Sequence, residues 1–199
     1  MKLRLTTAAL VGAAGLMGSL LVGAPAQADT CLEGIGCTTD VTFEVTAGAL
    51  QITVPDDVTL TNNGAPGGYA YGQLGDILVE DLRAEAGVGW TTTVSSTDFT
   101  TGPGPVFGPG ESIPNDDVYY CSGTGTTTGT GLFTPGQAGP CTAPPPPSGA
   151  ALGGTVTAYS HDTTGTGNNT ALWDPLLTVS IPLATIAGPF TGTVTHSVS

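Results

Sequence analysis

Apolar and polar residues alternate with a period of two near the start of the chain. The alternation first runs through Val41, Phe43 and Val45. Gly48 breaks the pattern, which resumes on the other parity over residues 50–54. Because alternation places every second side chain on one face, both stretches predict β-strands. The change of parity predicts a bulge or a tight bend at Gly48.

The rest of the chain also favours strands over helices. No window sustains a helical apolar period, and the chain contains 31 glycines and 16 prolines. Turn-forming Gly and Asn occur at 62–64 and 66–68. Further strands are predicted at residues 77–82, 88–95, 118–121, 155–159, 176–181 and 190–198. We therefore expect an all-β fold, an antiparallel β-sandwich with Greek-key-like connections around one core.

Residues 123–149 differ in composition from their surroundings. They are rich in Gly and Thr and end with four prolines at 144–147. The segment could link two domains, but only about three strands follow it, too few for an independent sandwich. We expect one domain over residues 29–199, with a disordered or Pro/Gly/Thr-rich loop at about 122–150. The prolines predict a stiff polyproline II segment on the surface.

The first 28 residues have the organisation of an export signal. Lys2 and Arg4 precede a weakly apolar stretch at 5–22, and Ala-Gln-Ala at 26–28 is a small-residue cleavage site. We expect residues 1–28 to be removed and the protein to be secreted. The alternative is that residues 5–22 remain as a membrane anchor. No later apolar run approaches the roughly 20 residues that cross a bilayer, so no membrane contact is expected after cleavage.

The chain that follows this signal is strongly acidic. It contains one cation, Arg83, against all sixteen carboxylates, which gives a formal charge of −15. Nucleic-acid affinity depends on Lys and Arg side chains that neutralise phosphates. We therefore expect neither nucleic acid nor anionic lipid as a partner.

All four cysteines lie beyond the cleavage site. An even number of cysteines in an exported protein predicts disulfides, although four cysteines allow more than one pairing. We expect Cys31 to pair with Cys37 and Cys121 with Cys141, because each pair brackets a Gly/Thr-rich loop. The alternative, a zinc site, is disfavoured because neither spacing is the Cys-x-x-Cys of close zinc ligands.

The residues needed for familiar hydrolases are missing. The chain has two histidines, His161 and His196, and no Gly-x-Ser-x-Gly motif to supply an activated serine. A glycosidase would need two carboxylates facing each other across a cleft, with pKa values pushed apart. Sixteen carboxylates leave that alternative open, but solvated acidic side chains explain them more simply. We predict that the protein is not an enzyme.

The sequence predicts no cofactor. Calcium is the one ion that its acidic residues could coordinate. Acidic doublets stand at 56–57 and 116–117, and Asp76, Glu80 and Asp81 lie between them. Calcium takes about six to eight oxygen ligands, and sandwich loops can supply them. No Asp-x-Asp-x-Asp-Gly loop is present, so an acidic, solvated surface is the simpler interpretation.

Three stretches of the chain resemble parts of a known protein family. Residues 41–55 (VTFEVTAGALQITVP) and 87–99 (GVGWTTTVSSTDF) resemble the opening and the first tryptophan motif of the WxL-domain surface proteins of Gram-positive bacteria. Residues 179–198 look like the end of that domain, with a short turn, an aromatic residue and a Thr-rich last strand. The resemblance implies a β-domain that attaches non-covalently to the cell wall, with peptidoglycan as ligand.

The chain departs from the family at both signatures. The first signature is Trp-x-Leu, and here Trp90 is followed two positions later by Thr92. The second signature also has a tryptophan and a leucine, and this chain has His196 and Val198 there. The resemblance therefore supports the fold more directly than it supports wall binding.

The aromatic residues supply the candidate ligand contacts. Trp90 lies in an alternating strand and should face the core, although a binding role is the alternative. Trp173 precedes Asp-Pro and should be partly exposed, where its ring could stack on a sugar. His196 should share a face with Val194 and Val198. The candidate contacts are Trp90, Trp173, Asp174, Asn168, Asn169 and His196.

These observations lead to one main expectation about function. We expect a secreted, non-enzymatic protein of the cell-wall surface whose partner is cell-wall polysaccharide or peptidoglycan. The alternative is an extracellular module that binds other surface proteins or assembles with itself, through an exposed strand edge or the proline-rich loop.

Overall fold

The computed structural model describes residues 32–34, 38–102 and 108–199, and residues 44–199 form one compact unit. This unit is all-β, as predicted, and the helical structure in the described residues is one 3-10 turn, η1 (Asn115–Asp117). The predicted signal at 1–28 lies outside the described residues. The strands are β1 (Leu50–Thr53), β2 (Tyr69–Gln73), β3 (Ile77–Asp81), β4 (Trp90–Ser96), β5 (Phe99–Thr100), β6 (Ser112–Ile113), β7 (Val118–Cys121), β8 (Thr126–Thr128), β9 (Phe133–Pro135), β10 (Ala150–Ala151), β11 (Val156–His161), β12 (Asn169–Trp173), β13 (Leu176–Ser180) and β14 (Val194–Val198).

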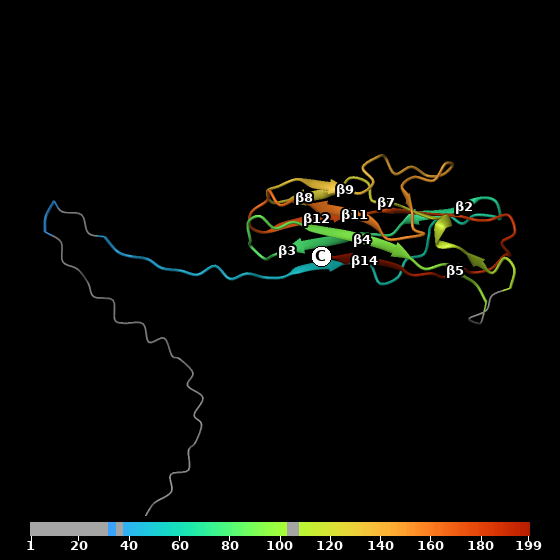
Figure 1. Ribbon diagram of the computed structural model, residues 1–199, viewed down its shortest axis with the longest axis horizontal. Helices are drawn as coiled ribbons and strands as arrows, with labels where there is room; N and C mark the ends of the chain where they lie inside the picture. Colours follow the sequence, from blue (N-terminus) through green and yellow to red (C-terminus); the bar gives the residue numbers. More distant parts are fainter. Residues whose placement is uncertain (1–31, 35–37, 103–107) are drawn as a thin grey trace, which may run out of the picture. The chain divides into compact units, whose positions relative to one another are not determined.

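One layer of the sandwich consists of two antiparallel sheets joined end to end. Their strand orders are β1-β3-β12-β8 and β10-β7-β13-β2. Three chain segments pass from one sheet into the other, through β2 and β3, β7 and β8, and β12 and β13 (Figure 1). The Leu74 N–H donates to the Pro175 carbonyl at 2.9 Å, so the pairing continues across the junction. The layer is therefore continuous, with a bend at the junction.

The second layer has the strand order β14-β4-β11-β9, and all its pairings are antiparallel. The pairing of β11 with β4 shifts between Thr157 and Tyr159, so Ala158 is the extra residue of a bulge. The shift changes the parity of the strand. As a result, both Tyr159 and His161 face the core, opposite Thr92 and Trp90.

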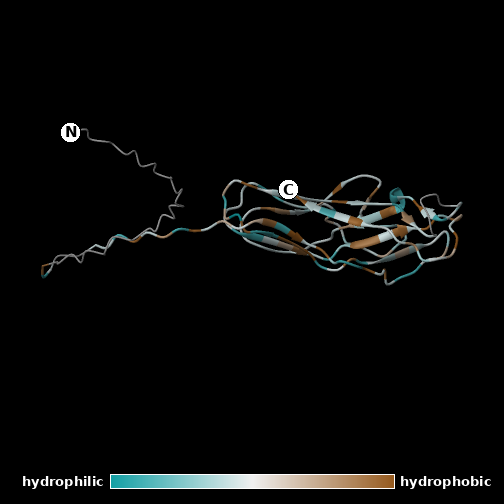
Figure 2. Cartoon of the chain, turned by 90° about the horizontal axis from the view of Figure 1, so that it is seen from below, coloured by the Kyte–Doolittle hydropathy of each residue, from teal (hydrophilic) through white to brown (hydrophobic). Residues whose placement is uncertain are grey.

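The core lies between the two layers and includes four buried aromatic side chains, Trp90, Tyr120, Tyr159 and Trp173. Trp173 of the first layer stacks on Tyr159 of the second, with ring centroids 4.9 Å apart. In Figure 2 the strongly apolar residues, in brown, lie mainly on the strands. The fully buried residues of the cluster include Ile77, Val79, Trp90, Val94, Val118, Tyr120, Leu152, Ala158, Ala171, Trp173 and Leu177.

The strands predicted near 50–54, 77–82, 88–95, 118–121, 155–159, 176–181 and 190–198 are confirmed within a few residues. The strand predicted at 41–45 is wrong, because that stretch contains no strand. Alternation gives a segment a face to bury, but a strand also needs a neighbour to pair with, and residues 41–45 have none among the described residues. Val41, Phe43 and Val45 are 80%, 83% and 73% exposed.

The predicted bulge at Gly48 is confirmed. The Gly48 N–H donates to the Leu82 carbonyl at 2.7 Å, and the Leu82 N–H donates to the Ala49 carbonyl at 2.9 Å. Two residues of one strand therefore face one residue of the other, which is the pattern of a β-bulge. A Cβ atom at position 48 would lie 2.7 Å from the Leu82 Cβ, so glycine is required by the close approach of the two chains.

Part of the disordered or Pro/Gly/Thr-rich loop predicted at about 122–150 forms strands. It contains β8, which pairs with β12, and β9, which pairs with β11. Threonine favours strands, and the Thr128 and Thr170 hydroxyls are 2.7 Å apart across the β8-β12 pair. The polyproline II prediction is wrong, because the chain bends at residues 144–146.

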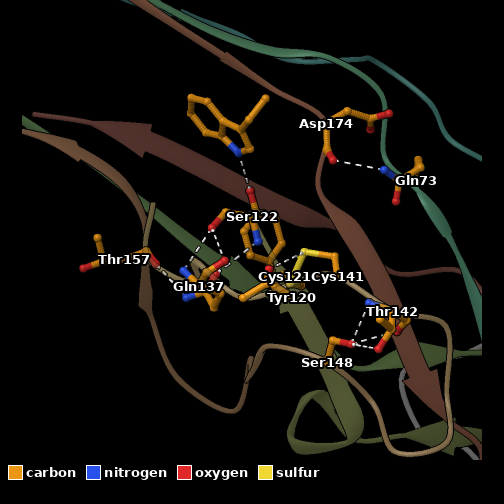
Figure 3. The surroundings of a disulfide bond; sticks show 12 residues. Gln73, Tyr120, Cys121, Ser122, Gln137, Cys141, Thr142, Ser148, Thr157 and Asp174 are labelled. Atoms are coloured by element: carbon orange, nitrogen blue, oxygen red, sulfur yellow. Dashed lines mark hydrogen bonds between the residues drawn. A yellow bond between two sulfur atoms is a disulfide. The ribbon is translucent and has the colours of Figure 1, made fainter. Parts of the chain in front are cut away.

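The disulfide between Cys121 and Cys141 is confirmed (Figure 3). It closes the segment that contains β8 and β9, which further hydrogen bonds hold in place. The Gln137 N–H donates to Ser122 Oγ at 3.0 Å, and the Gln137 side-chain amide donates to the Thr157 carbonyl at 3.0 Å. The predicted Cys31–Cys37 pair lies outside the described residues.

Removing the Cys121–Cys141 disulfide should destabilise the fold by about 3 kcal/mol. The bridge spans a sequence separation of 20 residues, and a closed loop of that size restricts the unfolded chain by about this amount in the loop-entropy model. Equilibrium denaturation of the Cys121→Ser/Cys141→Ser variant measures the loss. Ser148→Ala, which keeps the bridge and removes only the hydroxyl bonded to Thr142, is the control and should lose about 1 kcal/mol. Equal losses in the two variants would contradict the prediction.

Candidate functional site

An apolar groove of about 980 Å³ opens between the two layers. Residues 54–66, which connect β1 to β2, and residues 185–193, which lead into β14, are its two sides. Its floor is the hydrophobic core, including Leu177 and Val179 of β13. Exposed apolar side chains, Val54, Val58 and Ile186, stand at the groove. Such a pocket is suited to a ligand with an apolar face.

The groove exists because one edge of the sandwich lacks a strand. β1 and β14 lie next to each other, but the chain leaves the first layer after Thr53. Within the described chain, residues 54–60 make no backbone hydrogen bond to any other segment. Pro55 contributes to this, because proline has no N–H to donate. The main chain at this end of the sandwich therefore stays unpaired.

His196 lines the groove and belongs to a buried chain of hydrogen bonds. The Trp173 indole N–H donates to the Tyr120 hydroxyl oxygen at 2.9 Å. The same hydroxyl lies 3.1 Å from His196 Nε2. Since the indole can only donate, the Tyr120 proton is directed to His196 Nε2, which accepts it. His196 is therefore the neutral end of a chain that links the two layers.

Burial explains the protonation state of this chain. It lowers the pKa of His196 to about 4 and raises the pKa of the Tyr120 hydroxyl. Both groups are therefore neutral at pH 7. With its Nε2 occupied by Tyr120, His196 serves as a structural acceptor in the groove wall.

A second polar cluster surrounds Asp81 at the end of β3. Arg83 donates to both carboxylate oxygens of Asp81, each at 2.8 Å, and also to the Gly89 carbonyl at 3.1 Å. The Asn169 side-chain amide donates to Asp81 at 3.3 Å and accepts from the Trp90 indole at 2.8 Å. The cluster therefore ties β3 and β12 of the first layer to β4 of the second. The Arg83–Asp81 pair is the one salt bridge among the described residues.

The charges of this cluster are matched. The hydrogen bonds from the Arg83 side chain, which outweigh the effect of burial, lower the pKa of Asp81. The Asp81 carboxylate likewise raises the pKa of Arg83. Because each group satisfies the other, the cluster stabilises the fold and offers no free acid or base.

The other histidine is also held internally. His161 Nε2 lies 2.8 Å from the Thr130 carbonyl, so this nitrogen carries the proton. Its ring packs against Phe133, with centroids 4.5 Å apart. The neighbouring Asp162 carboxylate accepts hydrogen bonds from the Leu132 N–H and from Thr164, which lower the pKa of Asp162. His161 and Asp162 therefore fix loops.

The structure separates the residues predicted to bind a sugar. Trp90 faces the core, as the first interpretation proposed. The partial exposure predicted for Trp173 is wrong: it is 2% exposed, because its side chain points from β12 toward the second layer, where it stacks on Tyr159, and its indole reaches Tyr120. Asn169 is buried as well, while Asn168 and Asp174 are exposed at opposite ends of β12. These residues therefore do not form a common binding face. His196 does share a face with Val194 and Val198, as predicted.

The acidic residues do not form a metal site. No group of three or more His, Cys, Asp or Glu side chains is arranged to hold a metal within residues 32–34, 38–102 and 108–199. Asp56 and Asp57 lie on one side of the groove. Asp81 and Asp162 both have lowered pKa values, whereas the general acid of a glycosidase needs a raised one.

Sequence reasoning missed the groove and the role of Tyr120. The available signal was the stretch from 54 to 66, which has two prolines, two adjacent aspartates and only a short alternation. Such a stretch predicts a long connection, but not that a groove opens beside it.

No protein-family model, curated protein or solved structure matches this chain. Among the described residues, none of the helical structure has the length and apolar character of a membrane span.

Replacing Arg83 by methionine should destabilise the protein by about 3 kcal/mol. The substitution leaves the Asp81 carboxylate buried without its charge partner, which costs about 3–5 kcal/mol for a buried pair. We expect the low end of that range, because the Arg83 side chain is 26% exposed. Denaturant unfolding measures the loss. Arg83→Lys, which keeps the charge but not the two-point contact, should lose less; a methionine variant as stable as the wild type would exclude a structural role for the pair.

Stability should fall as the pH is lowered from about 6.5 to about 4. The folded-state pKa of His196 is lowered to about 4. In this pH window His196 therefore binds a proton in the unfolded chain but not in the folded chain. The free energy of unfolding then decreases by up to about 1.4 kcal/mol per pH unit. His196→Gln keeps an acceptor for Tyr120 without titrating. A plot of the free energy of unfolding against pH should therefore be flatter for this variant than for the wild type. Equal slopes for the two proteins would contradict the role given to His196.

Proposed function

We propose that this chain is a secreted, non-enzymatic domain of the cell surface that acts by attachment, with the groove as its contact surface. One observation carries the proposal: the groove is lined by apolar side chains, among them the exposed Val54, Val58 and Ile186, and is bordered by unpaired main chain. The buried polar clusters around Asp81 and Tyr120, by contrast, satisfy their own hydrogen bonds. A contact surface is the function that such an opening supports best.

The resemblance to WxL domains supports a cell-wall ligand, with peptidoglycan as the candidate. Residues 179–198, which carry the second half of that resemblance, include β14 and most of one side of the groove. His196, which stands where the family has its second tryptophan, lines the groove. A wall polymer would therefore contact the part of the chain that most resembles a wall-binding domain.

The charge of the protein restricts how it could bind a wall. A formal charge of −15 opposes adsorption to anionic wall polymers at low salt. Binding would have to use neutral contacts in the groove or a bridging divalent ion. Salt and calcium should both favour it, because both reduce the repulsion.

A second candidate is attachment to another extracellular protein. The unpaired main chain of residues 54–60 supports it, because a protein strand can pair with such an edge through regular hydrogen bonds. A polysaccharide has no equivalent repeat of donors and acceptors.

The exported protein should sediment with isolated wall sacculi, and more of it should do so with added calcium or at higher ionic strength. Val58→Asp places a charge at the groove and should weaken binding by about tenfold or more, since a polar group in an apolar contact costs over 1 kcal/mol. Leu132→Asp adds the same charge at an exposed leucine outside the groove and should bind like the wild type. Recovery in the supernatant under every condition would remove the proposal of wall attachment.

A further inference from the structure

The chain contains an apolar strand-forming segment without a partner. Val41, Phe43 and Val45 are exposed and alternate with the polar residues Thr42 and Glu44. In an extended conformation the three apolar side chains would lie on one face. A soluble protein rarely exposes such a face without a use for it.

The groove has the features that such a segment needs. Its lining is apolar, and the main chain of residues 54–60 on one side is unpaired. On the other side, β14 pairs with β4 and with no other strand of the described chain. An inserted strand would therefore find hydrogen-bonding partners along its edges and apolar contacts for every second side chain.

The segment cannot fill the groove of its own molecule. The chain is already bound to the sheet at Gly48, through the hydrogen bond to Leu82. From Gly48 the chain extends six residues, roughly 20 Å, to reach Val54 at the groove. Val41, seven residues from the same anchor, could span this distance, but Phe43 at five residues and Val45 at three reach only about 16 and 10 Å from it, so the segment as a whole cannot enter. The groove that these side chains could enter belongs to another copy.

We propose that residues 41–45 of one copy insert into the groove of a second copy as an added strand. The contact joins two different surfaces of the same chain, so it does not close on a twofold axis. Each copy offers one segment and one groove, and repetition of the contact would give an open, head-to-tail assembly. This proposal rests on the groove being a contact surface, but it does not require the wall ligand.

The charge of the protein predicts how this assembly responds to salt. Copies that each carry a formal charge of about −15 repel one another. Asp56 and Asp57 at the groove would also lie near the incoming Glu44. Screening weakens these repulsions, since the Debye length falls from about 10 Å at 0.1 M salt to about 3 Å at 1 M. Association should therefore strengthen as salt is added, which is the opposite of an association driven by opposite charges.

Light scattering and sedimentation velocity on the exported protein provide the first test. The mean mass should rise with protein concentration and with salt. Phe43→Ser should weaken association by about 10- to 100-fold, the contribution expected from burying one large apolar side chain. Leu132→Ser, which removes another exposed apolar side chain, should associate like the wild type. A protein that stays monomeric at every concentration and salt, or a Phe43→Ser variant that assembles normally, would overturn the proposal.

Cross-linking identifies the surfaces in contact. A variant carrying both Phe43→Cys and Val58→Cys should form a disulfide-linked ladder on non-reducing gels. A variant with Phe43→Cys and Leu132→Cys should not extend beyond dimers. A ladder of equal length in both variants, or only intramolecular closure in the first, would refute insertion between copies. Wall sedimentation separates the two proposals, because Phe43→Ser keeps an intact groove. If this variant loses assembly but still binds the wall, both proposals are supported. If the wild type assembles but does not bind the wall, only the inserted strand is supported.

Discussion

The ion pair between Asp81 and Arg83 is the interaction on which the described fold depends most. Asp81 is buried where β3 meets β12 and β4, and a carboxylate in that position is stable only with a charged, two-point partner. Through Asn169 the pair also fixes the Trp90 indole, and hence the packing of one layer on the other. Because Arg83 is the one cation after residue 28, its use here leaves the other carboxylates without a basic side chain to pair with.

The second constraint is an edge of the sandwich that the chain does not complete. A strand at a sheet edge presents unpaired N–H and C=O groups and requires covering or protection. Here the connection at 54–60 runs along the opening without pairing, and its Val54 and Val58 side chains are exposed. The strongly acidic character of the chain offers one form of protection, since like charges keep such edges apart at low salt. The same polypeptide also carries a strand-forming segment without a partner, residues 41–45. Together, the opening and this segment favour contacts between molecules.

The candidate site shows where sequence reasoning reached its limit. The inward direction of His196 followed from alternation in the last strand. Its hydrogen bond to Tyr120 did not, because the two residues are 76 positions apart and meet only when the layers pack. Trp173 was predicted at the surface from its neighbours Asp174 and Pro175, yet those two residues form the junction between β12 and β13 while the indole turns into the core. Neighbours in sequence describe the backbone at a position, and they do not decide what lies across the core from it.

By itself, the sequence determined the fold class, most of the strands, the bulge at Gly48, the inward direction of Trp90 and the acidic character of the chain. These properties follow from local periods, backbone conformation and composition, which are written in short stretches of residues. Only the tertiary structure decided that Cys121 pairs with Cys141, that residues 41–45 have no partner, that Trp173 is buried and that a groove opens beside residues 54–60. Each of these depends on which distant segments pack together, and that packing is a sum of contacts across the whole core rather than a property of any one segment.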